Sequence, residues 1–410
     1  MRADNLIQSP SRRTFLKAAT LAGIEWSTRG AGALSPDSSG RIFAYVGTDT
    51  KPVDGAANGK GIYAYELDQR TGGLRLLKLA AETVDPSWIC IHPSQRSLYA
   101  VNEVSDYEGN SGSVSAFAID RVSGDLQFLN TVSSHGAGPT HMSVDATGKY
   151  AFVANYYGGS IAVLPIRTDG SLESAVFVHQ DENSLGAQHA GSAPKGSFAI
   201  SGHDAPHAHM IQADPSNHFV LQTDLGQDRI YVYNFDSHTG RLTPANTPFY
   251  SLPSGDGPRH FVFHPNGRWM YSIQEEASTL VFFHYDPVTG TLAAKQTVST
   301  LPPGFTGTNF CSEVIISPDG LYLYAANRLH NSIAVFRIAK DGMLTRKGEV
   351  LAEGDYPNDV VLDPSGKTIY VCNQRSDQIT VFRRNEQTGM LAFTGEYLPL
   401  GTPMCMAFLD

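Results

Sequence analysis

The 410-residue chain has little of what several protein classes require. No stretch approaches the roughly 18 consecutive apolar residues of a membrane-spanning helix, so we expect no membrane span. No G-x-S-x-G motif occurs, and no Ser or Cys stands in a nucleophile context, so covalent catalysis is not expected. The four cysteines lack CxxC or metal-like spacing and lie in apolar segments. We interpret them as core residues: Cys90, Cys311, Cys372 and Cys405.

Positive charge is also scarce. The chain has 30 Lys and Arg against 40 Asp and Glu, a net charge of −10. Without residues 1–33 the balance is 25 against 38, a net charge of −13. So acidic a chain is a poor ligand for nucleic acids or anionic membranes, and we expect neither as a partner.

The N-terminus resembles a targeting segment. Residues 11–17 read SRRTFLK, a short run of small residues follows, and Ala31-Gly32-Ala33 is a plausible cleavage site. We interpret residues 1–33 as a twin-arginine export signal, which predicts a periplasmic protein and the twin-arginine export machinery as a partner. Glu25 makes the apolar region short, and a basic disordered tail is the alternative.

What the chain has in abundance is one hairpin, repeated. Residues 257–276 read GPRHFVFHPNGRWMYSIQEE, with an apolar run before a Pro-Asn-Gly turn and an aromatic-rich run after it. The turn at Pro265 has five equivalents, each followed nine residues later by a polar amide or acid. They are Pro93, Ala146, Pro215, Pro318 and Pro364. Turn-to-turn spacings of 53, 69, 50, 53 and 46 residues fit four-stranded propeller blades.

A seventh repeat is divided between the two ends of the chain. The C-terminal PMCMAFLD resembles a first strand, and RIFAYVGT and GIYAYELD near the N-terminus resemble the strands that should follow it. The sequence therefore predicts an all-β fold over residues 41–410. It should be a seven-bladed β-propeller of four-stranded antiparallel blades, closed by strands from both termini so that no sheet edge stays open.

The long 69-residue spacing comes from a polar insertion at residues 180–205, which we expect to be a loop. Histidines lie in and beside it, and an HxH pair on a strand faces one way, which raises the question of a metal site. They are His179, His189, His203, His207 and His209. No nearby carboxylate pattern completes a ligand set, so we expect neither a metal nor another cofactor.

Aligning the repeats on their turns gathers polar residues at one end of the ring. Six residues before the turn stand Ser87, Thr140, His209, Arg259, Ser312 and Asn358. Ten residues after it stand Glu103, Tyr156, Leu225, Glu275, Arg328 and Gln374. Five residues before it, pointing to the alternate side of the strand, we expect Trp88, His141, Met210, His260, Glu313 and Asp359. Salt bridges between blades would explain these residues, and a binding or catalytic mouth is the other interpretation.

Several motifs resemble a known family. They are PHAHM (206–210), DLGQDRIYVY (224–233), GPRHFVFHPNGRWMY (257–271), SEVIISPDGLYLYAANR (312–328) and NSIAVF (331–336). Together they resemble the seven-bladed lactonase family, which contains propeller-type 6-phosphogluconolactonases and is similar to fungal carboxymuconate lactonising enzymes. The resemblance covers residues 41–410 and implies a hydrolase whose partner is a small lactone with an anionic group.

The muconate branch of that family has a proposed site of one His, two Arg and one Glu. By motif these fall on His209, Arg259, Glu275 and Arg328. We expect Glu275 as general base, with Glu313 as the other candidate, the arginines as ligands of the substrate anion and the oxyanion, and His209 as acid to the leaving oxygen. We expect further substrate contacts from His260, Glu313, His141 and His207.

One motif departs from the family pattern. AANRLHNSI stands where SNRGxDSI is usual, so His330 occupies a position that is normally near an acid, which affects the expected substrate. A role on phosphorylated cytoplasmic sugars also fits poorly with export. Two alternatives stay open: a secreted, non-catalytic propeller that acts as a binding module, and a muconate-type lactonising cyclase.

Overall fold

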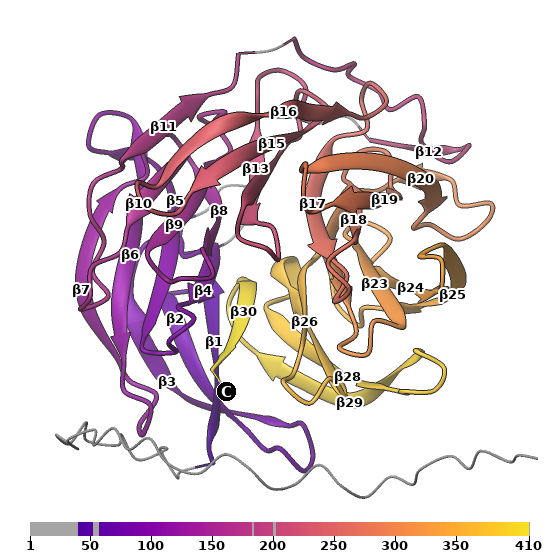
Figure 1. Ribbon diagram of the computed structural model, residues 1–410. Coiled ribbons are helices and arrows are strands. Elements are labelled where there is room, and N and C mark those ends of the chain that lie inside the picture. Colours follow the sequence, from indigo (N-terminus) through magenta and orange to yellow (C-terminus); the bar gives the residue numbers. More distant parts are fainter. Residues whose placement is uncertain (1–39, 52–56, 183, 200–201, 410) are drawn as a thin grey trace, which may run out of the picture. The chain divides into compact units, whose positions relative to one another are not determined.

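The computed structural model describes residues 40–51, 57–182, 184–199 and 202–409 (Figure 1). The expected export signal, residues 1–33, lies outside this part of the chain. None of the helices formed by the described residues has the length and apolar character needed to cross a membrane.

The predicted all-β fold and its seven four-stranded blades are confirmed, and neighbouring strands of every blade pair antiparallel. The blade shared by the two ends of the chain contains, from the innermost strand outward, β30 (Pro403–Leu409), β1 (Ile42–Thr48), β2 (Gly61–Leu67) and β3 (Leu74–Glu82). The next two contain β4 (Trp88–Ile91), β5 (Ser97–Tyr107), β6 (Ser111–Ile119) and β7 (Leu126–Ser133), then β8 (Pro139–Val144), β9 (Tyr150–Asn155), β10 (Ser160–Pro165) and β11 (Phe177–Gln180).

The remaining four blades follow the same order. They contain β13 (Ala208–Ala213), β14 (Phe219–Asp224), β15 (Arg229–Asp236) and β16 (Arg241–Ser251); β17 (Pro258–Phe263), β18 (Trp269–Gln274), β19 (Thr279–Asp286) and β20 (Thr291–Ser299); β22 (Cys311–Ile316), β23 (Tyr322–Asn327), β24 (Ser332–Ile338) and β25 (Leu344–Leu351); and β26 (Pro357–Leu362), β27 (Thr368–Asn373), β28 (Gln378–Arg384) and β29 (Leu391–Pro399). A short parallel pair, β12 (Ser197–Phe198) and β21 (Gly307–Thr308), ties the insertion to the β20–β22 connection. Among these described residues, one 3-10 turn occurs, η1 (Gln374–Ser376).

The innermost strands close the ring. Each innermost strand contacts the innermost strand of the next blade, in the order β4, β8, β13, β17, β22, β26 and β30 (Figure 1). The last of them, β30, contacts the first, β4. β30 also pairs with β1 from Phe43 opposite Leu409 to Thr48 opposite Pro403. The divided blade therefore forms as the sequence predicts, and strands from both ends of the ring replace an open sheet edge.

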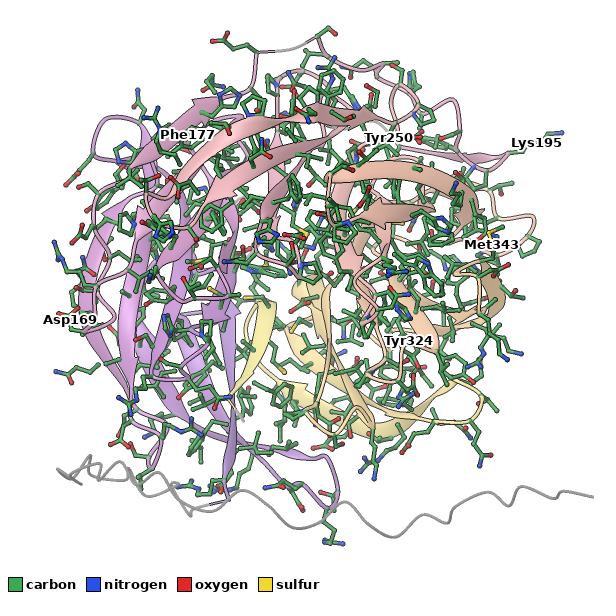
Figure 2. The ribbon with its side chains drawn as sticks, viewed as in Figure 1. Asp169, Phe177, Lys195, Tyr250, Tyr324 and Met343 are labelled. Carbon is green, nitrogen blue, oxygen red and sulfur yellow. The ribbon has the colours of Figure 1, made fainter. Side chains whose placement is uncertain are left out.

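The hydrophobic core lies between blades. Each apolar cluster combines residues of two consecutive blades, and side chains fill these spaces (Figure 2). Between the fifth and sixth blades, for example, Tyr271, Phe282 and Phe336 are at most 1% exposed. Cys311, Cys372 and Cys405 are unpaired thiols buried in such clusters, as expected of core residues, while Cys90 is half-buried. Since each blade needs both neighbours to bury its faces, the ring is one folding unit.

A β-bulge near the start of the innermost strand recurs in the blades. On β17, Pro258 pairs with Gln274 but His260 pairs with Ile273, so Arg259 is the extra residue. Register shifts at the same place occur on β8, β13, β22, β26 and β30. Because a bulge sets two consecutive residues against one, both side chains turn toward the axis. The expectation that Arg259 and His260 point to opposite sides is therefore wrong, and both line the central cavity.

Candidate active site

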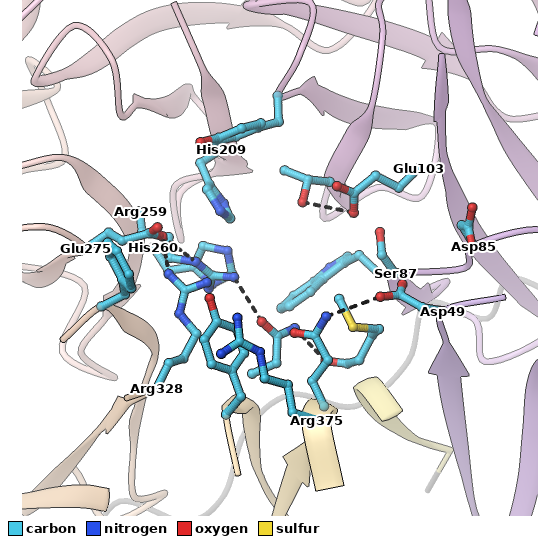
Figure 3. Close-up of a pocket in the computed structure, with 18 of the residues that line it drawn as sticks. Asp49, Asp85, Ser87, Glu103, His209, Arg259, His260, Glu275, Arg328 and Arg375 are labelled. Atoms are coloured by element: carbon cyan, nitrogen blue, oxygen red, sulfur yellow. Dashed lines mark hydrogen bonds and ion pairs between the residues drawn. The ribbon is translucent and has the colours of Figure 1, made fainter. Parts of the chain in front are cut away.

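A cavity of about 560 Å³ opens at the axis of the ring (Figure 3). All seven blades contribute to its wall, which places it at the centre rather than between two blades. The residues near the start of the innermost strands form one row: Ser87, Thr140, His209, Arg259, Asn358 and Met404. The residues ten positions after each turn, with Asp49 of the divided blade, form another: Asp49, Glu103, Tyr156, Glu275, Arg328 and Gln374.

Two arginines share one carboxylate in this wall. Oε2 of Glu275 lies 3.1 Å from Nε of Arg259 and 2.6 Å from Nη2 of Arg328. Backbone groups hold the guanidiniums from behind, since Arg259 Nη1 donates to the carbonyl of Ser312 at 2.8 Å and Arg328 Nη2 to that of Cys311 at 3.1 Å. All three charged side chains are buried, so the cluster presents one net positive charge where electrostatic interactions are weakly screened.

Arg328 keeps donor capacity for a ligand. Its Nε is buried and makes no hydrogen bond within the described part of the chain. Its guanidinium lies 5.1 Å from the ring centre of Tyr356, and the guanidinium of Arg375 lies 3.7 Å from the same ring. Arg375 is exposed at the rim and, among the described residues, forms no ion pair. Arg375 therefore adds a further cation to the cavity wall, stacked on the Tyr356 ring.

The opposite side of the cavity is acidic. Asp49, Asp85 and Glu103 face the arginines across the mouth (Figure 3). Burial raises the pKa of the Glu103 carboxyl to about 7. Asp85 is a structural acceptor, because its Oδ1 takes the backbone N–H groups of Thr50 and Lys51 at 2.8 and 2.7 Å. Asp49 and Glu103 line the same side, where Asp49 accepts from Nε2 of Gln374 at 3.3 Å and Glu103 from Oγ1 of Thr140 at 3.5 Å.

Histidines occupy the inner end of the cavity. His209 lines the wall, and its ring makes an edge contact with His260 at a centroid distance of 5.0 Å. Burial, and then the charge of Arg259, lower the pKa of both imidazoles well below the usual value, so both are neutral at pH 7. The Nδ1 atom of His260 lies 2.7 Å from Oε2 of Glu313.

The structure brings five of the eight predicted site residues to the cavity wall and leaves three behind it. The five are His209, Arg259, His260, Glu275 and Arg328. Glu313 contacts Nδ1 of His260, and the ring centre of His141 lies 4.7 Å from that of Trp88. His207 stacks on Tyr156 at 4.3 Å and supports that wall. His330 bonds Ser332 and does not line the cavity, so the departure from the family motif lies outside the mouth.

Sequence reasoning missed several residues of the wall. Asp49 follows Thr48 at the end of β1, at the offset that Glu103 and Glu275 occupy in their repeats, so alignment of the divided blade would have found it. Arg375 directly follows the aligned Gln374. Tyr356 has no such signal, because it lies in the loop before β26 with a positive φ of 63°.

Comparisons with known proteins agree on one family. The family model "Lactonase, 7-bladed beta-propeller" matches residues 43–408. A 6-phosphogluconolactonase from Bacillus subtilis is 32% identical over 370 residues, which cover 90% of this chain and 99% of that protein. A putative 6-phosphogluconolactonase from Bacteroides fragilis superimposes with a TM-score of 0.79 at 31% identity, covering 91% of this chain and 99% of the other. A periplasmic gluconolactonase from Pseudomonas aeruginosa gives a TM-score of 0.79 at 30% identity, with 90% and 99% covered.

Proposed function

Because the chain belongs to the lactonase family of seven-bladed β-propellers, and is a lactone hydrolase, we propose that the axial cavity opens the ring of an anionic sugar-type lactone. The observation that carries this proposal is the cluster of Arg259, Arg328 and Glu275 beside the neutral His209. Hydrolysis of a lactone needs positive charge where the oxyanion develops and a group that takes a proton from water. The cavity supplies both.

The arginine pair is suited to the oxyanion. The buried Nε–H of Arg328 has no hydrogen-bond acceptor in the ranges that the structure describes, and a guanidinium keeps its charge throughout the reaction. Glu275 engages both arginines through one oxygen, which fixes their positions before the substrate arrives. We assign Glu275 this holding role, since a carboxylate between two guanidiniums prevents their mutual repulsion.

His209 is better suited to accept a proton than to begin the reaction as an acid. Its imidazole is neutral, which changes the role that we expected from the sequence. Nε2 would take a proton from water while the water oxygen bonds to the carbonyl carbon, and the carbonyl electron pair moves to the oxygen beside Arg328. When the ring C–O bond breaks, the imidazolium returns the proton to the leaving oxygen, so lactone and water give one hydroxy acid.

The two halves of the cavity match a hydroxylated substrate with one anionic group. Sugar hydroxyls can donate to Asp49 and Glu103, and these carboxylates repel a negative group on their side. The anion is then directed to Arg375 at the opposite rim. We expect Arg375→Ala to raise KM about tenfold for a phosphorylated sugar lactone and to change KM little for its neutral analogue, at similar kcat. Initial rates on the two substrates measure this, and equal effects on both would contradict the anion assignment.

The activity itself is tested with purified protein and a panel of 6-phosphogluconolactone, gluconolactone and muconolactone. We expect hydrolysis of the sugar lactones well above the spontaneous rate. Activity on muconolactone alone would support the cyclase alternative. If no lactone is opened, the binding-module alternative replaces the proposal.

We also propose that the protein is exported through the twin-arginine pathway, since residues 11–17 carry that motif and a periplasmic gluconolactonase is among its structural relatives. Replacing Arg12 and Arg13 by Lys should leave the full-length chain in the cytoplasm. Cell fractionation and N-terminal sequencing measure this. A double variant that still appears outside the cytoplasm in shortened form would disprove the signal.

A further inference from the structure

His260, which pairs with Glu313, is in edge contact with His209, and the pair takes no part in the mechanism above. We propose that His209, His260 and Glu313 form one hydrogen-bonded chain, in which the buried pair orients His209 and neutralises the charge that His209 gains when it takes a proton. This inference rests on the proposed function, because it concerns the proton transfer of the same site. His260 and Glu313 are positioning residues in this proposal, since neither bonds the substrate.

The inner half of the chain is already formed. Nδ1 of His260 and Oε2 of Glu313 are 2.7 Å apart, and the other carboxyl oxygen accepts the backbone N–H of Val314 at 2.8 Å. Both side chains are under 10% exposed. A carboxylate in this position keeps the proton of the imidazole on Nδ1 and leaves Nε2 as an acceptor. Glu313, which the sequence offered as a second candidate for general base, therefore accepts the Nδ1 proton of His260 instead of facing the substrate.

The outer half of the chain is indicated by two unpaired nitrogens. Nε2 of His260 and Nδ1 of His209 are both buried, and neither finds a hydrogen-bond partner among the residues that the structure describes. Their rings are in edge contact, at 5.0 Å and 75°, and the His209 ring reaches toward that of His260 (Figure 3). Buried polar atoms without partners are costly, so two of them on touching rings indicate a bond between the rings during the reaction.

The charges around the two imidazoles explain why a carboxylate is needed there. Arg259 and Arg328 oppose a positive charge on either ring, and His141 packs against His260 from β8. Glu275 on the cavity side favours such a charge. Glu275 already neutralises one arginine, so Glu313 is the remaining anion within the stack that can compensate an imidazolium. Asp359 on β26 is a further carboxyl beside Glu313, and it accepts the backbone N–H of Met406 at 2.8 Å.

The chain assigns each proton. With Glu313 ionised, His260 donates from Nδ1 to the carboxylate, and His209 donates from Nδ1 to Nε2 of His260. The free Nε2 of His209 then faces the cavity and accepts the proton of the attacking water. His209 transfers the same proton to the leaving oxygen of the lactone ring when the C–O bond breaks. His260 and Glu313 therefore have the same protonation state at the end of the cycle as at its start.

The chain predicts a pH dependence with a definite sign. Burial raises the pKa of Glu313 to about 7, although Arg259 opposes this. Only the ionised carboxyl compensates an imidazolium, so kcat should be full above this pH and fall as the pH decreases through about 7. Glu313→Gln should remove this acid limb and lower the plateau of kcat about 10- to 100-fold. This loss is a fraction of the rate enhancement of about 10²–10⁴ that general acid–base catalysis contributes.

Two variants separate this effect from other acids that titrate nearby. Asp359→Asn removes a buried carboxyl at the same level of the ring and can still accept from Met406, so it should keep the acid limb. Glu103→Gln should also keep the limb in kcat, whatever it does to KM. If the limb disappears in either of these variants and persists in Glu313→Gln, the proposal is overturned.

A second measurement needs no substrate. In full-length protein labelled with nitrogen-15 in histidine, the ring nitrogens of His209 should show a step with a midpoint of about pH 7, because they sense Glu313 through His260. The step should vanish in Glu313→Gln. A His209 signal without that step overturns the chain even if lactones are hydrolysed. If the step is present and no lactone is opened, the proposed function fails while the chain stands.

Discussion

Glu275→Gln should lower kcat on sugar lactones by roughly 10²–10⁴ while the protein stays folded. The substitution keeps the shape of the side chain but removes the charge that holds Arg259 at 3.1 Å and Arg328 at 2.6 Å. Two buried guanidiniums then repel each other, and the donors that should meet the oxyanion move apart. Steady-state kinetics measure the loss, and a melting curve checks the fold, because removing one partner of a buried ion pair costs about 3–5 kcal/mol.

The matched control is Glu349→Gln. Glu349 also pairs with an arginine, Arg346, at 2.6 Å, but on the half-exposed face of β25 away from the cavity. We expect its kcat to equal that of the wild type, because this pair does not line the axial cavity, and a partly exposed pair contributes little to stability. If Glu275→Gln retains full activity, the arginine cluster is a rim of salt bridges and the catalytic assignment fails.

Deleting residues 403–410 should abolish cooperative folding of the ring. β30 is the innermost strand of the divided blade, pairs with β1, and contacts both β4 and β26. Its Cys405, Met406 and Leu409 are under 10% exposed in the clusters on the two sides of that blade. At about 1.5–3 kcal/mol for each large apolar side chain, the loss approaches the total stability of about 5–15 kcal/mol for a typical domain.

The control for this deletion shortens a turn. Val288 and Thr289 lie between β19 and β20, and Val288 is 83% exposed. Deleting these two residues removes no buried apolar surface, so the melting temperature of this variant should stay close to that of the wild type. Thermal unfolding monitored by circular dichroism compares the two deletions. An unchanged melting temperature without residues 403–410 would show that β30 does not close the ring.

The sequence by itself determined the number of blades, their strand order and the row of residues at the mouth. These features follow from local rules, because side chains alternate along a strand and a Pro-Asn-Gly turn sets the register of a hairpin. Equal offsets in each repeat therefore become equal heights in the ring. Arg259, Glu275, Arg328 and His209 were found in this way, and all four line the cavity.

Only the tertiary structure decided how these side chains face one another. The bulge on β17 turns Arg259 and His260 to the same side, and no local sequence pattern predicts this bulge. The ion pair of Glu275 with Arg328 and the contact of Glu313 with His260 each join two neighbouring blades, whereas the ion pair of Glu275 with Arg259 lies within one blade. The two contacts between blades depend on how the blades pack, which no local pattern sets. Burial then sets the charge of each group, because desolvation keeps the imidazoles neutral and holds the Glu313 proton to a higher pH.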